Sequence, residues 1–190
     1  MSVLTAGNSW RASGSFYLLL FVVVPATFIV HEFAHWVMGE LLGYSMTMSL
    51  NAVSPAEGGY RSAIDAMLVS AAGPLITILQ AVIAYLLIRR SGSALFYPFL
   101  FIALFMRAAA MLVSIANPND EARISMMLGI GTWTLPALVI SGLFAMTWMA
   151  SRKLGLHWTV NVYSYIVASV GVTGVVYLNA VLTGIAFIPG

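Results

Sequence analysis

Cysteine is absent from this 190-residue sequence, and charged residues are scarce. The lack of cysteine excludes disulfides, thiolate zinc sites, iron–sulfur clusters and a cysteine nucleophile. Charged residues make up 7% of the chain, far below the roughly 25% of a soluble domain. With eight Lys+Arg and six Asp+Glu in total, the sequence supports neither a nucleic-acid-binding surface nor an acidic tail. Any metal site must therefore use histidine and carboxylate ligands.

Long uncharged runs dominate the sequence, of which 61% is hydrophobic. A helix needs about 20 apolar residues to cross the hydrocarbon core of a bilayer. We therefore predict an all-α, multi-pass membrane protein, a bundle of about five transmembrane helices in a single domain over residues 1–190. The fourth run is too long for one straight crossing. We therefore expect either that its first turns lie near the interface or that the helix breaks at Gly129 and Gly131. The expected helices cover residues 12–42, 66–88, 94–116, 124–150 and 160–181.

Basic residues give the bundle a predicted orientation, because they stay on the cytoplasmic side of a membrane. With five crossings most of them fall on one side, and only Arg61 and Arg123 lie in loops on the other. We therefore expect a cytoplasmic N-terminus and an integral protein of the plasma membrane. The basic residues on the predicted cytoplasmic side are Arg11, Arg89, Arg90, Arg152 and Lys153.

One segment departs from the helical pattern. From Tyr44 to Asn51 apolar and polar residues alternate, which is the period-2 pattern of a strand. Residues 51–61 contain proline and glycine and are expected to form a turn region. We predict a short strand or hairpin at the outer membrane surface, where an unpaired edge over residues 44–50 would accept an extended peptide. An ordinary interfacial loop with chance alternation is the alternative.

Glycines and an arginine within the apolar spans carry weaker information. Gly73, Gly171 and Gly174 indicate close packing of helices. Arg107, inside the third span, would pair with a carboxylate, face a water-filled cleft or lie at a helix interface. The sequence alone assigns Arg107 no role.

His31, Glu32 and His35 form the sequence H-E-x-x-H near the C-terminal end of the first helix. Residues four apart on a helix emerge on the same face, so both imidazoles can bind one metal ion with Glu32 beside them. This is the pattern of a zinc hydrolase, in which a metal-acidified water gives its proton to the carboxylate. With three histidines and four glutamates in the chain, chance produces the motif in about one such sequence in a thousand.

The alternative interpretation makes these residues buried polar groups of the bundle, without a ligand. It leaves Glu32, between the two histidines, unexplained. Ionisable groups inside an apolar span are costly to insert and are functional by default. We therefore predict a metal centre with Glu32 as the catalytic residue.

A catalytic zinc site usually has three protein ligands and one position for water, so a third ligand must come from elsewhere. Asp120 and Glu121 lie at the polar junction between the third and fourth helices, on the same predicted side as the histidines. Asp65 and Glu57 share that side but belong to the loop or the start of the second helix, and are weaker candidates. His157 lies on the opposite face, roughly 20 Å or more of membrane away.

These motifs resemble those of the site-2-protease family of intramembrane zinc metalloproteases. In that family an H-E-x-x-H helix is joined by an L-D-G-G-R-like motif on a later transmembrane helix, whose aspartate is the third ligand. Residues 31–43 are similar to the first motif and its flank, and residues 120–124 to the second. Residues 71–75 resemble the A-G-P-L stretch of the family's intervening helix. The strand predicted at residues 44–50 is a further similarity.

The resemblance covers about residues 28–124 and implies one Zn²⁺ per chain, bound by His31, His35 and Asp120. Residues 16–124 would then form the catalytic core, and residues 125–190 would supply additional transmembrane helices.

The sequence departs from the family pattern around its second motif. Glu121 and Ala122 replace the two glycines after the aspartate, and the Asn/Pro-rich approach is shortened to residues 117–119. Glu121 therefore stays in reserve as third ligand. Asn117 is assigned to binding the substrate backbone, with Asn119 as the alternative.

Together these features predict an intramembrane zinc metalloprotease that cleaves membrane-protein substrates in or near their transmembrane segments. A zinc-dependent membrane hydrolase of a non-peptide substrate would use the same ligands. A non-proteolytic metal-binding membrane protein or transporter would use the histidines and Asp120 but gives Glu32 no proton to transfer. A di-iron desaturase or hydroxylase needs many histidines, and this chain has three.

Overall fold

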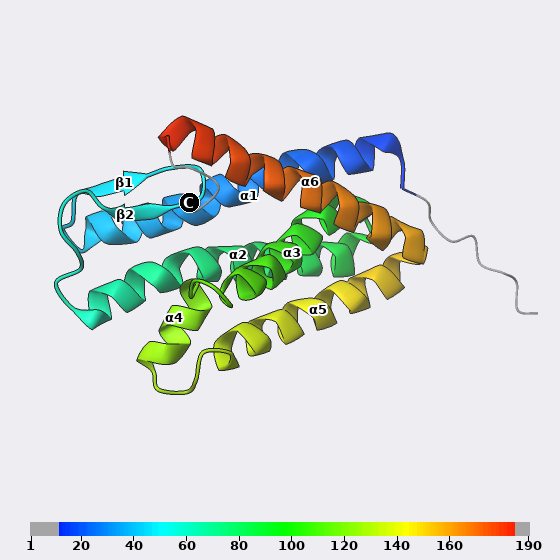
Figure 1. Cartoon of the computed structure of the whole chain (residues 1–190). Coiled ribbons are helices and arrows are strands. Elements are labelled where there is room, and N and C mark those ends of the chain that lie inside the picture. The colour runs from blue at the N-terminus through cyan, green and yellow to red at the C-terminus, as the bar shows by residue number, and fades with distance from the viewer. Residues whose placement is uncertain (1–11, 185–190) are drawn as a thin grey trace, which may run out of the picture.

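The computed structural model describes residues 12–184 and is an all-α bundle with one small β-hairpin (Figure 1). Five of its helices are long and apolar enough to cross a membrane, which confirms the predicted multi-pass membrane fold. A short 3-10 helix, Ala94–Phe96, leads into the third of them. The five helices are α1 (Gly14–Leu41), α2 (Ala63–Ser91), α3 (Tyr97–Val113), α5 (Thr134–Leu154) and α6 (Trp158–Thr183).

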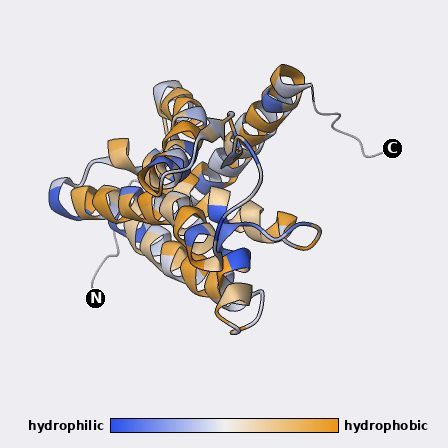
Figure 2. Cartoon of the chain, turned by 90° about the vertical axis from the view of Figure 1, so that its left-hand side faces the viewer, coloured by the Kyte–Doolittle hydropathy of each residue, from blue (hydrophilic) through white to orange (hydrophobic). Residues whose placement is uncertain are grey.

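The bundle is built around α1, α2 and α3, which contact one another. Helix α6 packs on α1 and α3, and α5 packs on α2 and α3. Most residues of the helices are hydrophobic (Figure 2), as expected of helices that cross a bilayer. Every spanning helix exposes a large leucine: Leu18, Leu75, Leu112, Leu138 and Leu182.

Of the two glycines in α6 that were predicted to allow close helix packing, one does so and the other does not. A Cβ atom at Gly171 would lie 3.0 Å from Val24 Cγ2, so this glycine allows α6 to approach α1 closely. A Cβ atom at Gly174 would meet no heavy atom of the described residues within 4 Å. The packing role predicted for Gly174 is therefore wrong.

The predicted strand is present but shorter than expected, and it has a partner. Strand β1 (Met46–Met48) pairs antiparallel with β2 (Val53–Pro55), in the register Met46 with Pro55. The turn region predicted for residues 51–61 was therefore wrong over β2. The outer edge of β1 is also occupied, because Met46 N–H donates to Glu40 Oε1 (2.8 Å) and Trp36 Nε1–H donates to the Met46 carbonyl (3.2 Å). The unpaired edge expected on this strand is not available at Met46.

The long fourth run breaks at its glycines, which was one of the two predictions made for it. Helix α4 (Asp120–Met127) ends before a loop in which Gly129 (φ 69°) and Gly131 (φ 86°) adopt left-handed backbone conformations. Ser125 secures this loop by donating from its hydroxyl to the Gly131 carbonyl and accepting from Leu135 N–H (3.3 Å). The break makes α4 a separate helix that begins at Asp120.

The hairpin and α4 lie at the same end of the bundle, and the α5–α6 turn lies at the other (Figure 1). His157 caps α6 at that turn, far from the hairpin end, as predicted. Basic residues in the last turns of α2 and α5 gather at the same end as His157. Arg11, which the predicted charge distribution also uses, lies outside the described residues.

Candidate metal centre

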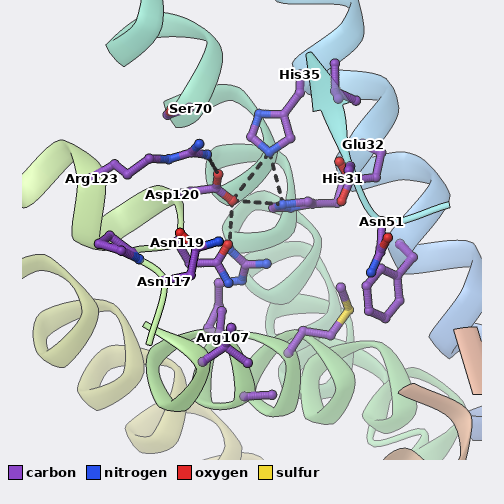
Figure 3. Close-up of a pocket in the computed structure, with 18 of the residues that line it drawn as sticks. His31, Glu32, His35, Asn51, Ser70, Arg107, Asn117, Asn119, Asp120 and Arg123 are labelled. Atoms are coloured by element: carbon purple, nitrogen blue, oxygen red, sulfur yellow. Dashed lines mark hydrogen bonds and ion pairs between the residues drawn. The ribbon is translucent and has the colours of Figure 1, made fainter. Parts of the chain in front are cut away.

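Two histidines of α1 meet the first residue of α4 in the interior of the bundle (Figure 3). His31, His35 and Asp120 are each no more than 6% exposed. The Nε2 atoms of the two histidines are 3.1 Å apart, and Asp120 Oδ2 lies 3.2 Å from His31 Nε2 and 3.4 Å from His35 Nε2. Three potential metal-binding atoms from two distant parts of the chain thus converge on one point.

Helix α2 fixes the orientation of both imidazoles through their other ring nitrogens. His35 Nδ1 is 2.6 Å from the Val69 carbonyl, which only accepts, so this nitrogen carries the proton. His31 Nδ1 is 3.0 Å from Thr77 Oγ1, whose own proton is donated to the Gly73 carbonyl (3.0 Å). In the neutral imidazoles both Nε2 atoms are therefore unprotonated and present lone pairs to each other and to Asp120.

A cluster of three acceptors is stable only with a positive charge among them, because the lone pairs otherwise repel one another. Ligands held by zinc at about 2.0–2.1 Å in a tetrahedron lie about 3.3–3.4 Å apart. The three observed separations, 3.1, 3.2 and 3.4 Å, are close to that spacing. The donor set, two imidazole nitrogens and a carboxylate oxygen, is also one that zinc prefers.

Gly73 of α2 provides the space in which the donors meet. A Cβ atom at this position would collide with His35 Nε2 and would lie 2.5 Å from His31 Cε1 and 2.7 Å from His31 Nε2. The absence of a side chain at residue 73 therefore keeps open a small volume bordered by both ring nitrogens. The sequence had indicated helix packing for Gly73, and the structure shows that what packs there is the histidine pair.

Asp120 is held by two arginines as well as by the histidines. Arg123 Nη2 donates to Oδ1 (2.7 Å), and Arg107 Nη1 lies 3.7 Å from Oδ2. The positive charges of these two guanidinium groups favour the ionised form of the Asp120 carboxyl. Asp120 is therefore a carboxylate anion.

Glu121, the reserve candidate for third ligand, points to a different partner. Its two carboxylate oxygens lie 3.1 and 3.3 Å from Arg107 Nη1. The carboxylate beside the histidines belongs to Asp120, one residue earlier.

A cavity of about 670 Å³ opens beside this group, lined by residues from α1, α3, α4, α6 and the hairpin. Glu32 lines it and is 6% exposed. Within residues 12–184 the Glu32 carboxylate makes no hydrogen bond or ion pair. Asn117 and Asn119 line the same cavity, so the structure brings both predicted substrate-binding candidates to the site.

The hairpin contributes its second strand to the cavity wall. Val53 and Ser54 of β2 line the cavity together with Asn51. Of the two strands, β2 is the one that contributes residues to the cavity wall, and the outer edge of β1 is held by α1 at Met46.

The remaining predicted candidates lie elsewhere. Asp65 lies in the first turn of α2, where its carboxylate accepts from the Tyr44 hydroxyl (2.6 Å). Glu57 lines a second, smaller pocket beside the hairpin. His157 hydrogen-bonds to Thr159 at the far end of the bundle (2.8 Å). Each was a weak or rejected candidate in the sequence.

Several residues of the site were not assigned a role from the sequence. Thr77 and the Val69 carbonyl orient the histidines, and Arg107 and Arg123 surround Asp120. Two signals pointed to them: Gly73 and Thr77 are four apart, so they share a helix face, and an arginine inside an apolar span is a functional candidate by default.

Replacing Thr77 with valine tests how strictly the histidine tautomer is controlled. Valine keeps the volume but offers no acceptor to His31 Nδ1–H, so we expect zinc affinity to fall about 10–100-fold, as for other residues that orient metal-binding histidines. Competition with a chelator of known affinity measures the change. The matched control is Thr147→Val, which removes a buried hydroxyl in α5 that bonds Leu143 and should leave zinc affinity unchanged. Wild-type affinity in Thr77→Val would contradict the assignment.

The arrangement can hold a divalent cation next to an unengaged carboxylate, inside a cavity within a membrane-type bundle. Comparison of the chain with protein-family models, with curated proteins and with solved structures gave no match. The function of the protein is therefore inferred from the residues of the site.

Proposed function

We propose that this protein is an intramembrane zinc metalloprotease that hydrolyses peptide bonds in or near the transmembrane segments of membrane-protein substrates. The observation that carries the proposal is the cluster of His31, His35 and Asp120, whose metal-binding atoms lie 3.1 to 3.4 Å apart. Glu32 lines the adjoining cavity with its carboxylate unpaired within the described residues. A metal-binding cluster alone requires no such group.

His31, His35 and Asp120 would hold one zinc ion per chain. When bound, zinc would lower the pKa of a coordinated water toward 7 and polarise the substrate carbonyl. The orientation of both imidazoles by α2 and the ionised state of Asp120 prepare these residues to bind a cation without rearrangement.

Glu32 would act as the general base and then the general acid. It takes the proton of the attacking water and returns it to the leaving amine nitrogen, as a positioned carboxylate can. The side-chain amide of Asn117, on the same cavity, would donate a hydrogen bond to the carbonyl oxygen as negative charge develops there. Asn119 is the alternative donor.

A transmembrane substrate must unwind before it can be cleaved, because its helical backbone is hydrogen-bonded and protected. An extended segment could recover those hydrogen bonds by pairing with a strand edge. The edge of β2 suits this role, since Val53 and Ser54 line the cavity. This replaces the edge over residues 44–50 that the sequence had suggested.

The same features support membership of the site-2-protease family, on the motifs at residues 31–35 and 120–124. The basic residues at the ends of α2 and α5 support a cytoplasmic N-terminus. In that orientation the metal centre would lie toward the outer side. A plasma-membrane location fits this orientation.

Metal removal and restoration test the proposal. The protein purified in detergent is expected to contain about one zinc per chain by elemental analysis and to cleave members of a panel of single-span membrane substrates. A strong chelator should abolish cleavage, and stoichiometric zinc should restore it. Product masses would locate the cut within or beside the apolar segment.

Two other outcomes of this experiment would contradict the proposal. A protein that holds no zinc, even when zinc is supplied, contradicts the metal centre. Zinc binding without peptide cleavage favours the hydrolase of a non-peptide substrate or the metal-binding transporter.

A further inference from the structure

We infer that Arg107 and Glu121 form a positioning pair that holds Asp120 at the metal centre by fixing α4 onto α3. The inference rests on the metal centre of the proposed function but not on the bond that is cleaved. It assigns a role to the arginine inside an apolar span and to the acidic residue that follows the third ligand.

The pair joins two helices deep in the protein. Arg107 lies on α3 and Glu121 in the first turn of α4, and they are 5% and 6% exposed. Arg107 Nη1 is 3.1 and 3.3 Å from the two Glu121 oxygens and 3.7 Å from Asp120 Oδ2. One nitrogen of one side chain thus reaches the carboxylates of both neighbouring residues.

Helix α4 packs on α2 and α5, and the Arg107–Glu121 pair links it to α3 as well. It has eight residues, and helices of that length are marginal without tertiary contacts. The turn before it is fixed where Asn119 N–H donates to Ser114 Oγ (3.0 Å), and the loop after it contains two glycines with positive φ. Because Asp120 is its first residue, a small rotation of α4 would move the carboxylate away from the histidines.

The geometry of the pair indicates positioning rather than maximal stability. Arg107 uses Nη1 alone for both contacts, and its Nε is buried without a hydrogen-bond partner among residues 12–184. A pair selected for strength would use two nitrogens in parallel. Buried ion pairs are often no more stabilising than apolar residues of the same size, whereas they do restrict how elements dock.

In Figure 3, Arg107 and His35 lie on opposite sides of Asp120. The Nε2 atoms of the two histidines lie on one side of Asp120 Oδ2 and Arg107 Nη1 lies on the other, while Arg123 Nη2 donates to Oδ1. Glu121 neutralises Arg107, so that the arginine does not draw Asp120 out of the cluster. The pair explains why glutamate occupies the position after Asp120.

The test replaces the pair by apolar residues in the full-length protein. In the double variant Arg107→Met, Glu121→Met, we expect the zinc dissociation constant, from chelator competition, to rise about 10–100-fold. The thermal unfolding midpoint without metal should stay within a few degrees of wild type. The Co²⁺-substituted double variant should show altered d–d absorption, because the position of the carboxylate ligand has changed.

Tyr97→Phe is the control for a purely structural effect. It removes a partly buried hydrogen bond from the other end of α3, where the Tyr97 hydroxyl donates to Asn161 Oδ1 (2.6 Å). This variant should unfold at a lower temperature and bind zinc like wild type. Arg107→Lys keeps the charge but shortens its reach, so it should lose zinc affinity by a smaller factor and serves if the double variant does not fold.

The readout separates this inference from the proposed function. Wild-type zinc affinity in both the double variant and Arg107→Lys overturns the positioning pair, whether or not the protein is a protease. The positioning pair is also overturned if zinc affinity simply falls with thermal stability. In that case Tyr97→Phe, which is also less stable, would lose zinc affinity too. Wild-type protein that binds zinc tightly but cleaves no peptide overturns the protease and leaves the pair to be decided by affinity. Failure of wild type to bind zinc overturns both.

Discussion

Replacing Glu32 with glutamine is expected to lower the cleavage rate by about 10²–10⁴-fold, the usual contribution of general acid–base catalysis. The zinc content should stay at about one ion per chain, as for wild type. Glutamine has nearly the shape of glutamate, so it fits the same wall of the cavity, but it cannot take a proton from water. Elemental analysis and cleavage of a single-span substrate, on the same preparations, measure the two effects separately.

Glu40→Gln is the matched control, because Glu40 is a second glutamate of α1 and accepts a hydrogen bond from Met46 N–H. The amide oxygen of glutamine can accept the same bond, so activity should be unchanged. If Glu32→Gln kept both zinc and full cleavage, the general base would have to be another group. If wild type showed only metal transport and Glu32→Gln kept it, the non-proteolytic alternative would replace the protease.

Spans and the histidine pair were predictable because both depend on local pattern. A run of apolar residues long enough to cross a bilayer predicts a helix wherever it occurs. Two residues four apart share a helix face in any helix, so the meeting of His31 and His35 follows from secondary structure alone. Their orientation does not, because the partners of Nδ1 are on another helix.

The choice between Asp120 and Glu121 could not be made from local pattern. Adjacent residues of a helix point about 100° apart, and which one faces the histidines depends on how α4 is docked. That docking depends on the contacts of α4 with α2 and α5 and on the ion pair with Arg107, 14 residues away from Glu121 in the sequence. The unassigned role of Arg107 and the ambiguity between Asp120 and Glu121 therefore have the same explanation, the contact between Arg107 and Glu121.

The hairpin was half predicted for a similar reason. Residues 44–51 alternate, but the β2 segment is only three residues long and ends at Pro55, which reads as a turn. Its strand conformation comes from pairing with β1, a tertiary contact. The outer edge of β1 is occupied at Met46 by Glu40 and Trp36 of α1, which are also tertiary contacts.

Gly73→Ala is expected to remove zinc from the protein, although it adds only a methyl group. Its Cβ would take the space bordered by His31 Nε2 and His35 Nε2, so the rings must move apart. We expect the zinc content to fall from about one per chain to near zero, and cleavage to fall with it. In the metal-free protein the cost is modest, because alanine favours a helix by about 1 kcal/mol and overpacking costs about 1–3 kcal/mol.

Gly174→Ala is the matched control, since a Cβ atom there meets no heavy atom of the described residues within 4 Å. It should leave zinc content, cleavage and folding as in wild type. Comparing zinc content with unfolding temperature decides whether Gly73 serves the metal centre or only the packing of the helices. If Gly73→Ala lost zinc while its metal-free form unfolded near the wild-type temperature, the glycine would serve the metal centre. If the variant bound zinc normally, the volume at Gly73 would be a packing space, and the cation would have to lie on another side of the two nitrogens.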